Sequence, residues 1–258
     1  MKKINLTLLS FASFGFVCAA YGAEPQKAAA PAAMTALTPA QVADVEKVIA
    51  EYLMKNPGII SATMQAEAAA KQQEALEKMQ KAVAENKDKI FKNSATPVAG
   101  NPSGSKTLVV FMDPYCGYCK KFHAELPDFL KANKDVKIIF KDIPIMGEDS
   151  TTAVQAMFAA KAQGKYKELQ EAIFASEKHL SKEELFKLAA TVGVDAKALE
   201  KAMEKKEVLD QVAANQELAQ TLGVTGTPTL IIGETQVIPG YKSAEELTKI
   251  YAELPAAS

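Results

Sequence analysis

Hydrophobic positions in the first third of the chain recur with the spacing of an amphipathic helix. The sequence TPAQ, from Thr38 to Gln41, is a capping box with proline at the first helical position, and it predicts a sharp helix start. Asn56 and Pro57 predict the end of this helix. The apolar positions between these signals share one helix face, and they are Val42, Val45, Val48, Ile49, Tyr52 and Leu53.

A second helical pattern follows from Gly58 to about Phe91, and at about 1.5 Å per residue it would extend roughly 50 Å. Two interpretations are open: the helix lies on its own domain, or its narrow apolar stripe pairs with a second copy of the chain. We favour self-association, because a thin stripe on so long a helix needs a partner to cover it. The stripe runs at three- and four-residue steps through Leu76, Met79, Val83, Asn86 and Ile90.

In the centre of the chain, short runs of β-branched and aromatic residues replace the helical pattern. The runs TLVVFM (107–112) and VKIIFK (136–141) predict buried strands, and the helical pattern between them completes a β-α-β unit. A helical block follows over about 148–222, and its capping box pairs Ser181 with Glu184. The runs TLIIG and TQVIPG then predict two short strands, and SAEELTKIYAEL predicts a last helix. This order predicts an α/β fold with a helical insertion.

Residues 1–22 have the pattern of a secretory signal peptide. Lys2 and Lys3 precede an apolar run, and the small residues after it predict cleavage near Gly22. The run is too short and too polar for a good membrane span. Residues 23–37 are rich in alanine and proline and predict a flexible tether. Lipidation of Cys18 is disfavoured, because bulky residues precede it.

Composition and charge narrow the class of protein. The chain has 258 residues, of which 48% are hydrophobic and 24% charged, as is ordinary for a globular protein. Its formal net charge is −1, and all 30 basic residues are lysines. Without an excess of positive charge and without an arginine to clamp a phosphate, the chain is not expected to bind nucleic acid.

Two cysteines remain after export, Cys116 and Cys119, and disulfides persist outside the cytoplasm. A disulfide between them closes a two-residue loop and stabilises little, so a structural staple is disfavoured. Both lie where a strand passes into a helix, and a thiol at a helix N-terminus ionises easily. We therefore expect Cys116 to be the nucleophile and the more buried Cys119 to release the substrate. Between them, Gly117 is expected to permit a tight turn, and Tyr118 to form an aromatic lip.

A metal site is the main alternative for the same residues. Cys116, Cys119 and His123 have the spacing C-x2-C-x3-H, and copper is the metal that thiolates favour. A structural zinc site needs a fourth ligand, and the only other histidine, His179, falls in the distant helical block, where a solvated position is expected. We assign no metal ligand, and a copper-binding protein stays open as an alternative.

Two further features of the sequence, the dipeptide Thr227-Pro228 and the residue Asp113, concern the cysteine site. Thr227 and Pro228 directly precede a predicted strand, which suits a cis peptide bond. The backbone of Thr227 could then pair with an extended substrate, so that recognition depends on backbone and not on sequence. Asp113 is expected to cap the helix that starts at the cysteines, with proton transfer for Cys119 as the alternative.

With the motifs CGYC and TGTP, the chain resembles the exported thiol–disulfide oxidoreductases of the thioredoxin superfamily over residues 94–254. The segments KDIPIMGEDS and AAKAQGKYKELQEAI resemble the DsbA family, including its Com-type and ScsC-like members, whereas VFMDPYCGYCKKFH is similar to the DsbC isomerases. The resemblance implies a thioredoxin fold with Cys116 as nucleophile, Cys119 as resolving cysteine and Thr227-Pro228 as the cis-proline element.

Departures from the resemblance modify the expected function. Strong DsbA-type oxidases have a histidine where this chain has Tyr118, and many relatives have an acidic residue at the position of Val110. Both changes argue against a strongly oxidising site. The resemblance therefore implies a protein-disulfide isomerase with some oxidase activity. A dedicated DsbA-type oxidase is the first alternative.

The remaining expectations concern organisation. We expect residues 38–93 to be a helical oligomerisation region, forming a dimer or trimer, and residues 94–258 to be the thioredoxin-like domain. The redox-active pair Cys116-Cys119 requires no cofactor. The expected partners are unfolded or misoxidised exported proteins and a membrane redox protein that resets the cysteines. The expected location is the periplasm, and outer-membrane association stays open.

Overall fold

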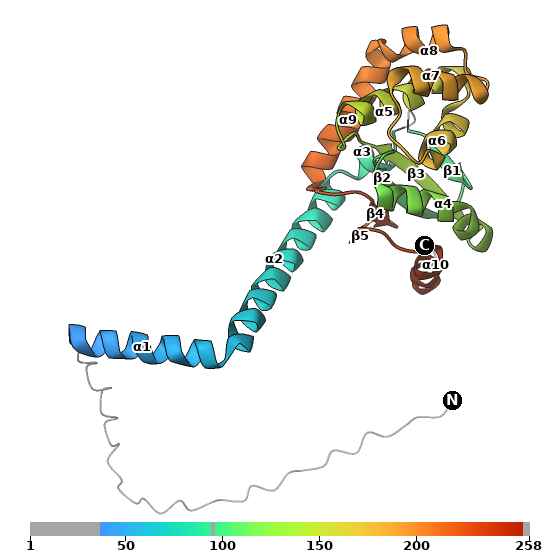
Figure 1. The fold of residues 1–258 in the computed structure, drawn as a ribbon. Coiled ribbons are helices and arrows are strands. Elements are labelled where there is room, and N and C mark those ends of the chain that lie inside the picture. The colour runs from blue at the N-terminus through green and yellow to red at the C-terminus, as the bar shows by residue number, and fades with distance from the viewer. Residues whose placement is uncertain (1–36, 94–95, 255–258) are drawn as a thin grey trace, which may run out of the picture. The chain divides into compact units, whose positions relative to one another are not determined.

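The structure is a computed structural model, and it describes residues 37–93 and 96–254 (Figure 1). The expected signal peptide, with Cys18, and residues 23–36 of the expected tether lie outside the described residues. The chain divides into two compact units, one ending at Ile60 and the other beginning at Ser61. The second unit contains the whole sheet and both cysteines of the CGYC motif.

Helix α1 (Pro39–Lys55) begins at the predicted capping box. The backbone N–H of Thr38 donates to Gln41 Oε1 at 2.9 Å, and the N–H of Gln41 donates to Thr38 Oγ1 at 3.4 Å. None of the residues of α1 is buried. The predicted apolar face is therefore present on the helix, and all of its side chains except that of the half-buried Leu53 are exposed to solvent in the single chain.

Helices α2 (Pro57–Glu85) and α3 (Lys87–Phe91) occupy the second predicted helical stretch, with a break at Asn86. Met79, Val83 and Ile90 are buried against the chain's own domain, where they pack with side chains of the sheet and of a later helix. The interpretation of this stripe as a free self-association seam was therefore wrong. The stripe is narrow because the sheet of the same chain covers it.

The sheet has five strands in the order β1-β3-β2-β4-β5. β2 and β3 are parallel, and the other neighbouring pairs are antiparallel. Four strands were predicted, and the fifth, β1, falls in a stretch that the sequence pattern left without structure. The strands are β1 (Val98–Gly100), β2 (Lys106–Met112), β3 (Val136–Asp142), β4 (Thr229–Ile232) and β5 (Gln236–Pro239).

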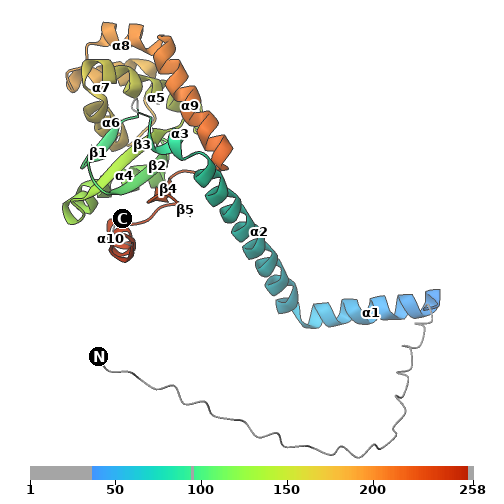
Figure 2. The same ribbon diagram turned by 180° about the vertical axis from the view of Figure 1, so that it is seen from behind.

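The two faces of the sheet bury alternate residues of β2. Leu108, Val110 and Met112 face a large cluster that contains side chains of α4 (Gly117–Ala132) and α10 (Ala244–Glu253). Val109 and Phe111 face a smaller cluster that contains residues of α2, α3 and α9. Both faces are covered, which is why the strand reads as a continuous apolar run and not as an alternating one. Figure 2 shows the helices on both sides of the sheet.

The helical insertion lies between β3 and β4. Its helix α7 begins at Ser181, where the predicted capping box with Glu184 is present. Most of the insertion packs on the same face of the sheet as α4 and contributes most of the larger cluster, whereas the C-terminal part of α9 packs on the other face. They are α5 (Glu148–Ala160), the 3-10 turn η1 (Lys161–Gln163), α6 (Tyr166–Ala175), α7 (Lys182–Thr191), α8 (Ala196–Met203) and α9 (Lys206–Leu222).

Among the helices of residues 37–93 and 96–254, none combines the length and the apolar character that a membrane crossing requires.

Candidate active site

The cysteine pair lies at the junction of β2 and α4. β2 ends at Met112, and Cys116 is the N-cap residue of α4, with extended backbone angles (φ −73°, ψ 122°). Cys119 is in the first turn of the helix and is completely buried, whereas Cys116 is half-buried. Both are unpaired thiols in this structure. Cys116, the expected nucleophile, is therefore the cysteine that meets the unsatisfied N–H groups of the helix start.

The pKa of the Cys116 thiol is lowered from 9.0 to about 5. The largest cause is a hydrogen bond from the Cys119 thiol. The backbone N–H groups of Cys119 and Tyr118 also favour the thiolate, while partial burial opposes it. At neutral pH the sulfur of Cys116 is therefore a thiolate, the form that attacks disulfides.

Cys119 has the opposite character. Burial raises the pKa of its thiol far above the ordinary value, and donating to Cys116 raises it further. The proton therefore stays on Cys119 while Cys116 is charged. This contrast is consistent with the expected roles of the two cysteines, which stay a prediction.

The Thr227-Pro228 peptide bond is cis, as the sequence suggested. The antiparallel pairing of β4 with β2 brings this loop beside the end of β2, and Phe111 is opposite Thr229. The Cys116 Sγ lies 3.2 Å from the carbonyl oxygen of Thr227, to which it donates a hydrogen bond when it is protonated. The structure thus brings together two motifs that are 111 residues apart in the sequence.

A cavity of about 380 Å³ adjoins the Thr227-Pro228 loop. One side consists of that loop and the end of β5, and the other consists of α2 side chains, among them Leu76 and Met79. Apolar lining next to exposed backbone suits a segment of extended polypeptide. The contribution of α2 was not predicted, because the sequence does not reveal which surface its stripe covers.

Asp113 is fully buried and does not cap α4. Its Oδ1 accepts hydrogen bonds from the Tyr115 N–H (2.7 Å) and the Ser150 hydroxyl (2.8 Å). Its Oδ2 accepts from the N–H groups of Ile145 (2.7 Å) and Met146 (3.0 Å). The expected capping role was therefore wrong: this carboxylate ties the segment before the cysteines to the loop after β3.

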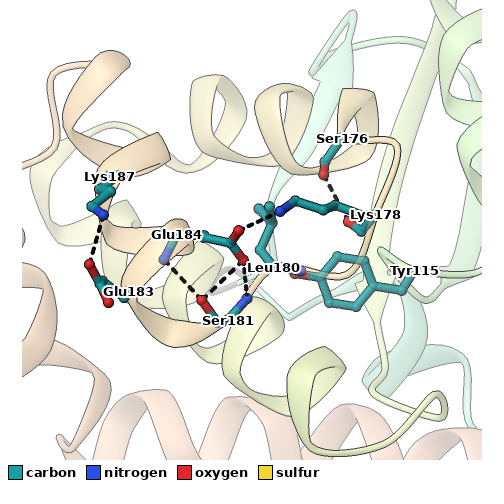
Figure 3. A network of polar contacts seen from close by, with 8 residues as sticks. All are labelled: Tyr115, Ser176, Lys178, Leu180, Ser181, Glu183, Glu184 and Lys187. Carbon is teal, nitrogen blue, oxygen red and sulfur yellow. Dashed lines mark hydrogen bonds and ion pairs between the residues drawn. The ribbon is translucent and has the colours of Figure 1, made fainter.

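Tyr115, directly before the nucleophile, anchors the loop between α6 and α7 (Figure 3). Its hydroxyl accepts a hydrogen bond from the Leu180 N–H at 3.1 Å. The ring of His179 stacks on the ring of Tyr115, with centroids 4.4 Å apart. His179 is exposed, as expected, but the sequence did not indicate that this loop borders the site. The same loop leads into the capping box of Ser181 and Glu184, which Lys178 also contacts.

The structure agrees with the expectation for Tyr118 between the two cysteines, but it gives Gly117 no special role in the turn. Tyr118 is 67% exposed, and its ring lies 6.4 Å from the ring of Tyr241, which fits an aromatic lip. A Cβ at Gly117 would meet no atom within 4 Å, and its φ is not positive. The turn at this position therefore does not depend on glycine.

His123 lies against α6 and not in a ligand cluster. Its ring stacks on Phe174 with centroids 4.4 Å apart, and burial lowers its pKa. In the part of the chain that the structure describes, no group of three or more His, Cys, Asp or Glu side chains could hold a metal ion. The spacing C-x2-C-x3-H therefore does not produce a set of converging ligands.

Comparisons with known proteins agree with this geometry. The sequence model of a family described as "DSBA-like thioredoxin domain" matches residues 107–252. The chain is 24% identical over 157 residues to the thiol:disulfide interchange protein DsbC of Escherichia coli, covering 59% of this chain and 53% of DsbC. It thus spans about half the length of that relative.

Two solved structures extend the comparison. A thioredoxin-like oxidoreductase from Silicibacter pomeroyi is 34% identical, with a TM-score of 0.62, and the match covers 65% of this chain and 96% of that one. A linker-deletion mutant of ScsC from Proteus mirabilis is 25% identical, with a TM-score of 0.64, and the match covers 85% and 97%. The thioredoxin-like fold is therefore shared with both proteins, and the match to the ScsC mutant covers more of this chain than the match to the Silicibacter pomeroyi protein.

Proposed function

Because the chain belongs to the family of DSBA-like thioredoxin domains, we propose that it is a protein thiol–disulfide oxidoreductase that acts mainly as a disulfide isomerase. The observation that carries the proposal is the contrast between the two cysteines. Cys116 has a pKa of about 5 and a half-buried sulfur, and Cys119 is buried and protonated directly behind it. A reactive thiolate with an internal resolving thiol is what disulfide exchange requires.

The proposed reaction begins when the Cys116 thiolate attacks one sulfur of a substrate disulfide. An S–S bond forms between Cys116 and the substrate, and the other substrate sulfur leaves as a thiolate. In isomerisation, a different substrate thiolate attacks the substrate sulfur of this mixed disulfide and releases Cys116 reduced. In resolution, Cys119 loses its proton and attacks Cys116, which leaves the enzyme oxidised and the substrate reduced.

We assign the cavity beside Thr227-Pro228 to the substrate chain on either side of its cysteine. The carbonyl of Thr227 is close to the Cys116 sulfur and can accept a backbone N–H from an extended substrate. Leu76 and Met79 provide an apolar surface for substrate side chains. Such contacts suit unfolded or misoxidised exported proteins, because they do not depend on one sequence.

A dedicated oxidase is the second candidate, and the low pKa of Cys116 favours it. Stabilising the thiolate stabilises the reduced enzyme, so the oxidised enzyme gives up its disulfide more readily. The resemblance of CGYC to the DsbC isomerases favours the first candidate. A membrane redox protein would reset the cysteines in either case, reoxidising an oxidase and reducing an isomerase.

Refolding of scrambled ribonuclease tests the proposal. The wild-type chain should restore ribonuclease activity in a redox buffer, and Cys116→Ala should not exceed the buffer alone. Cys119→Ala should retain part of the isomerase activity but accumulate mixed disulfides. A wild-type chain that oxidises reduced ribonuclease rapidly but does not rescue the scrambled form would instead establish the oxidase.

We further propose that the chain is a homo-oligomer, a dimer or trimer, assembled through α1. The support is the exposed apolar face of that helix, where Val45, Ile49 and Tyr52 are 44%, 52% and 57% exposed. Residues 1–22, as a signal peptide, would direct the protein to the periplasm, with outer-membrane association as the alternative. Assembly would place several cysteine sites around one substrate and hinder access by a partner that oxidises single domains.

A further inference from the structure

Lys141, near the end of β3, is a charged side chain in the interior of the domain. Only 1% of its surface is exposed. It is on the same side of the strand as Ile139, which belongs to the cluster formed with α2, α3 and α9. Its ammonium donates hydrogen bonds to the carbonyl oxygen of Lys89 and to Thr96 Oγ1, both at 3.1 Å. Two of its three N–H groups are thus satisfied by neutral oxygens.

The charge of Lys141 is not neutralised. Within the described part of the chain, no carboxylate lies within ion-pair distance of its ammonium. Burial alone lowers the pKa of this amine to about 8, so that it is still mostly charged at neutral pH. A buried charge without a counter-charge is costly, and an anion that reaches it is correspondingly favoured.

A cavity of about 260 Å³ adjoins Lys141, between α3, β3 and α9. Its charged lining residues are two lysines, Lys89 and Lys141, and one glutamate, Glu217. The amide of Asn215 also lines it, but that group already donates to the Asp142 carbonyl (3.1 Å) and accepts from Gln211 (3.1 Å). The cavity therefore has a net positive charge and one buried ammonium with a donor to spare.

We propose that this cavity is a binding site for one small monocarboxylate anion. The carboxylate would accept the remaining N–H of Lys141, and a short apolar tail would lie against Leu218, which lines the same space. Glu217 also lines the cavity, and its negative charge disfavours anions with two negative charges. The volume suits an acid of a few carbon atoms. No cysteine lines the cavity, so this proposal does not depend on the proposed redox function.

Titration of the full chain with sodium propionate tests the site, against sodium chloride and sodium phosphate at equal ionic strength. A ligand that binds only the folded chain raises the midpoint of thermal unfolding in a saturable way. We expect such a rise with propionate and none with chloride. Lys141→Met should weaken propionate binding about tenfold or more, as for loss of a charged hydrogen-bond partner. Lys137→Met is the matched control on the same strand, outside the cavity, and should leave the rise unchanged.

Two measurements keep Lys141 in place and remain decisive if Lys141→Met does not fold. Glu217→Gln removes the competing carboxylate and should lower the propionate concentration at half-saturation. In the wild-type chain, the ε-methylene NMR signal of Lys141 should shift on the same concentration scale. The proposal is overturned if propionate gives no saturable rise, if Lys141→Met retains the full rise, or if phosphate raises the midpoint as much as propionate.

Discussion

Among single residues, Cys116 and Cys119 have the same side chain and opposite proton affinities. The step of three positions from one to the other carries the chain from the open start of α4 to its buried face. The sulfur of Cys116 gains hydrogen bonds in its charged form, and that of Cys119 loses water and gains no counter-charge. The shift of each pKa thus follows from position on the helix and not from a neighbouring cation.

The alkylation rate of Cys116 should therefore follow a titration with a midpoint near pH 5. The rate rises with pH through this midpoint, because the thiolate is the species that reacts. Cys119→Ala removes the largest contribution to the low pKa and should move the midpoint upward, whereas Cys119→Ser keeps a donor and should move it less. Iodoacetamide kinetics followed by mass spectrometry measure the midpoint. A profile centred near 9 in the wild-type chain would contradict the proposed role of Cys116.

The same shift predicts how the stability of the reduced chain depends on pH. The folded pKa of Cys116 lies below the value of 9.0 expected in the unfolded chain, so between these values the unfolded state binds the additional proton. The contribution to stability is complete above about pH 9 and is lost as the pH falls through about 5. Urea unfolding of wild type and Cys116→Ser should therefore show a difference that grows from pH 5 to pH 9. A constant difference would contradict the shift.

Asp113 should matter for folding more than for chemistry. Asp113→Asn leaves one acceptor oxygen and places an amide donor against backbone N–H groups, in a site that holds four donors. We expect a loss of about 3 kcal/mol in the free energy of unfolding, since hydrogen bonds to a buried charge are among the strong ones. Ser150→Ala removes one donor only and should cost about 1 kcal/mol. Urea denaturation compares the two, and equal losses would contradict this account of Asp113.

At the residue scale, the sequence predicted which residues form the cysteine site better than it predicted which groups surround them. The strand-to-helix junction, which the pattern located, places Cys116 at the helix start and Cys119 on the buried face. The partners of Asp113 could not be predicted, because they belong to a loop after β3 whose position depends on the whole sheet. The same holds for the stacking of His179 on Tyr115, which joins residues 64 positions apart through the packing of α6 on α4 and of α7 on α6.

At the scale of elements, α1 and α2 show that an apolar stripe does not identify what covers it. Both helices carry stripes with helical spacing. The stripe of α2 is covered by the sheet and α9, whereas that of α1 is exposed in the single chain. Periodicity predicts a buried face, and only the position of the sheet distinguishes burial within the chain from burial against another copy. β1 was missed for a related reason: three residues that include Ala99 and Gly100 become a strand through pairing with β3.

If α1 holds the oligomer together, charges on its apolar face should dissociate it. Val45→Glu with Ile49→Glu places two carboxylates where side chains of a second copy would have to pack, and the mass from light scattering should fall to that of one chain. Lys47→Glu lies on the opposite face of α1 and is the control, with no change in mass expected. A wild-type chain that is a monomer at all concentrations, or a double variant that keeps the wild-type mass, would reject assembly through this helix.

At the scale of the whole molecule, the cysteine site is assembled from parts that are far apart in the sequence. The helix start supplies the sulfurs, the loop before β4 supplies the Thr227 carbonyl, and α2 supplies one side of the adjoining cavity. The sequence identified the first two by motif, since few residue patterns satisfy their backbone geometry. It did not identify the third, because α2 carries no motif and reaches the cavity only by packing on the domain.

Two shortened chains test separately what α1 and α2 contribute. A chain that begins at Ser61 loses α1 but keeps the second compact unit, so it should fold and retain the low pKa of Cys116. It should also be monomeric and weak as an isomerase, if assembly is what provides the substrate cleft. Light scattering, the alkylation profile and the ribonuclease assay test these three statements separately. Full isomerase activity in this monomer would show that assembly through α1 serves another purpose.

A chain that begins at residue 94 should be much less stable than the chain that begins at Ser61, although it still contains the whole cysteine motif. It loses the buried side chains of Met79, Val83 and Ile90, each of which stabilises by about 1.5–3 kcal/mol. Their sum is comparable to the entire free energy of unfolding of an ordinary domain, about 5–15 kcal/mol. We therefore expect this shorter chain to unfold at much lower urea concentrations and to lose the Cys116 titration. If it were as stable as the chain from Ser61, then α2 would be an appendage of the domain and not part of its core.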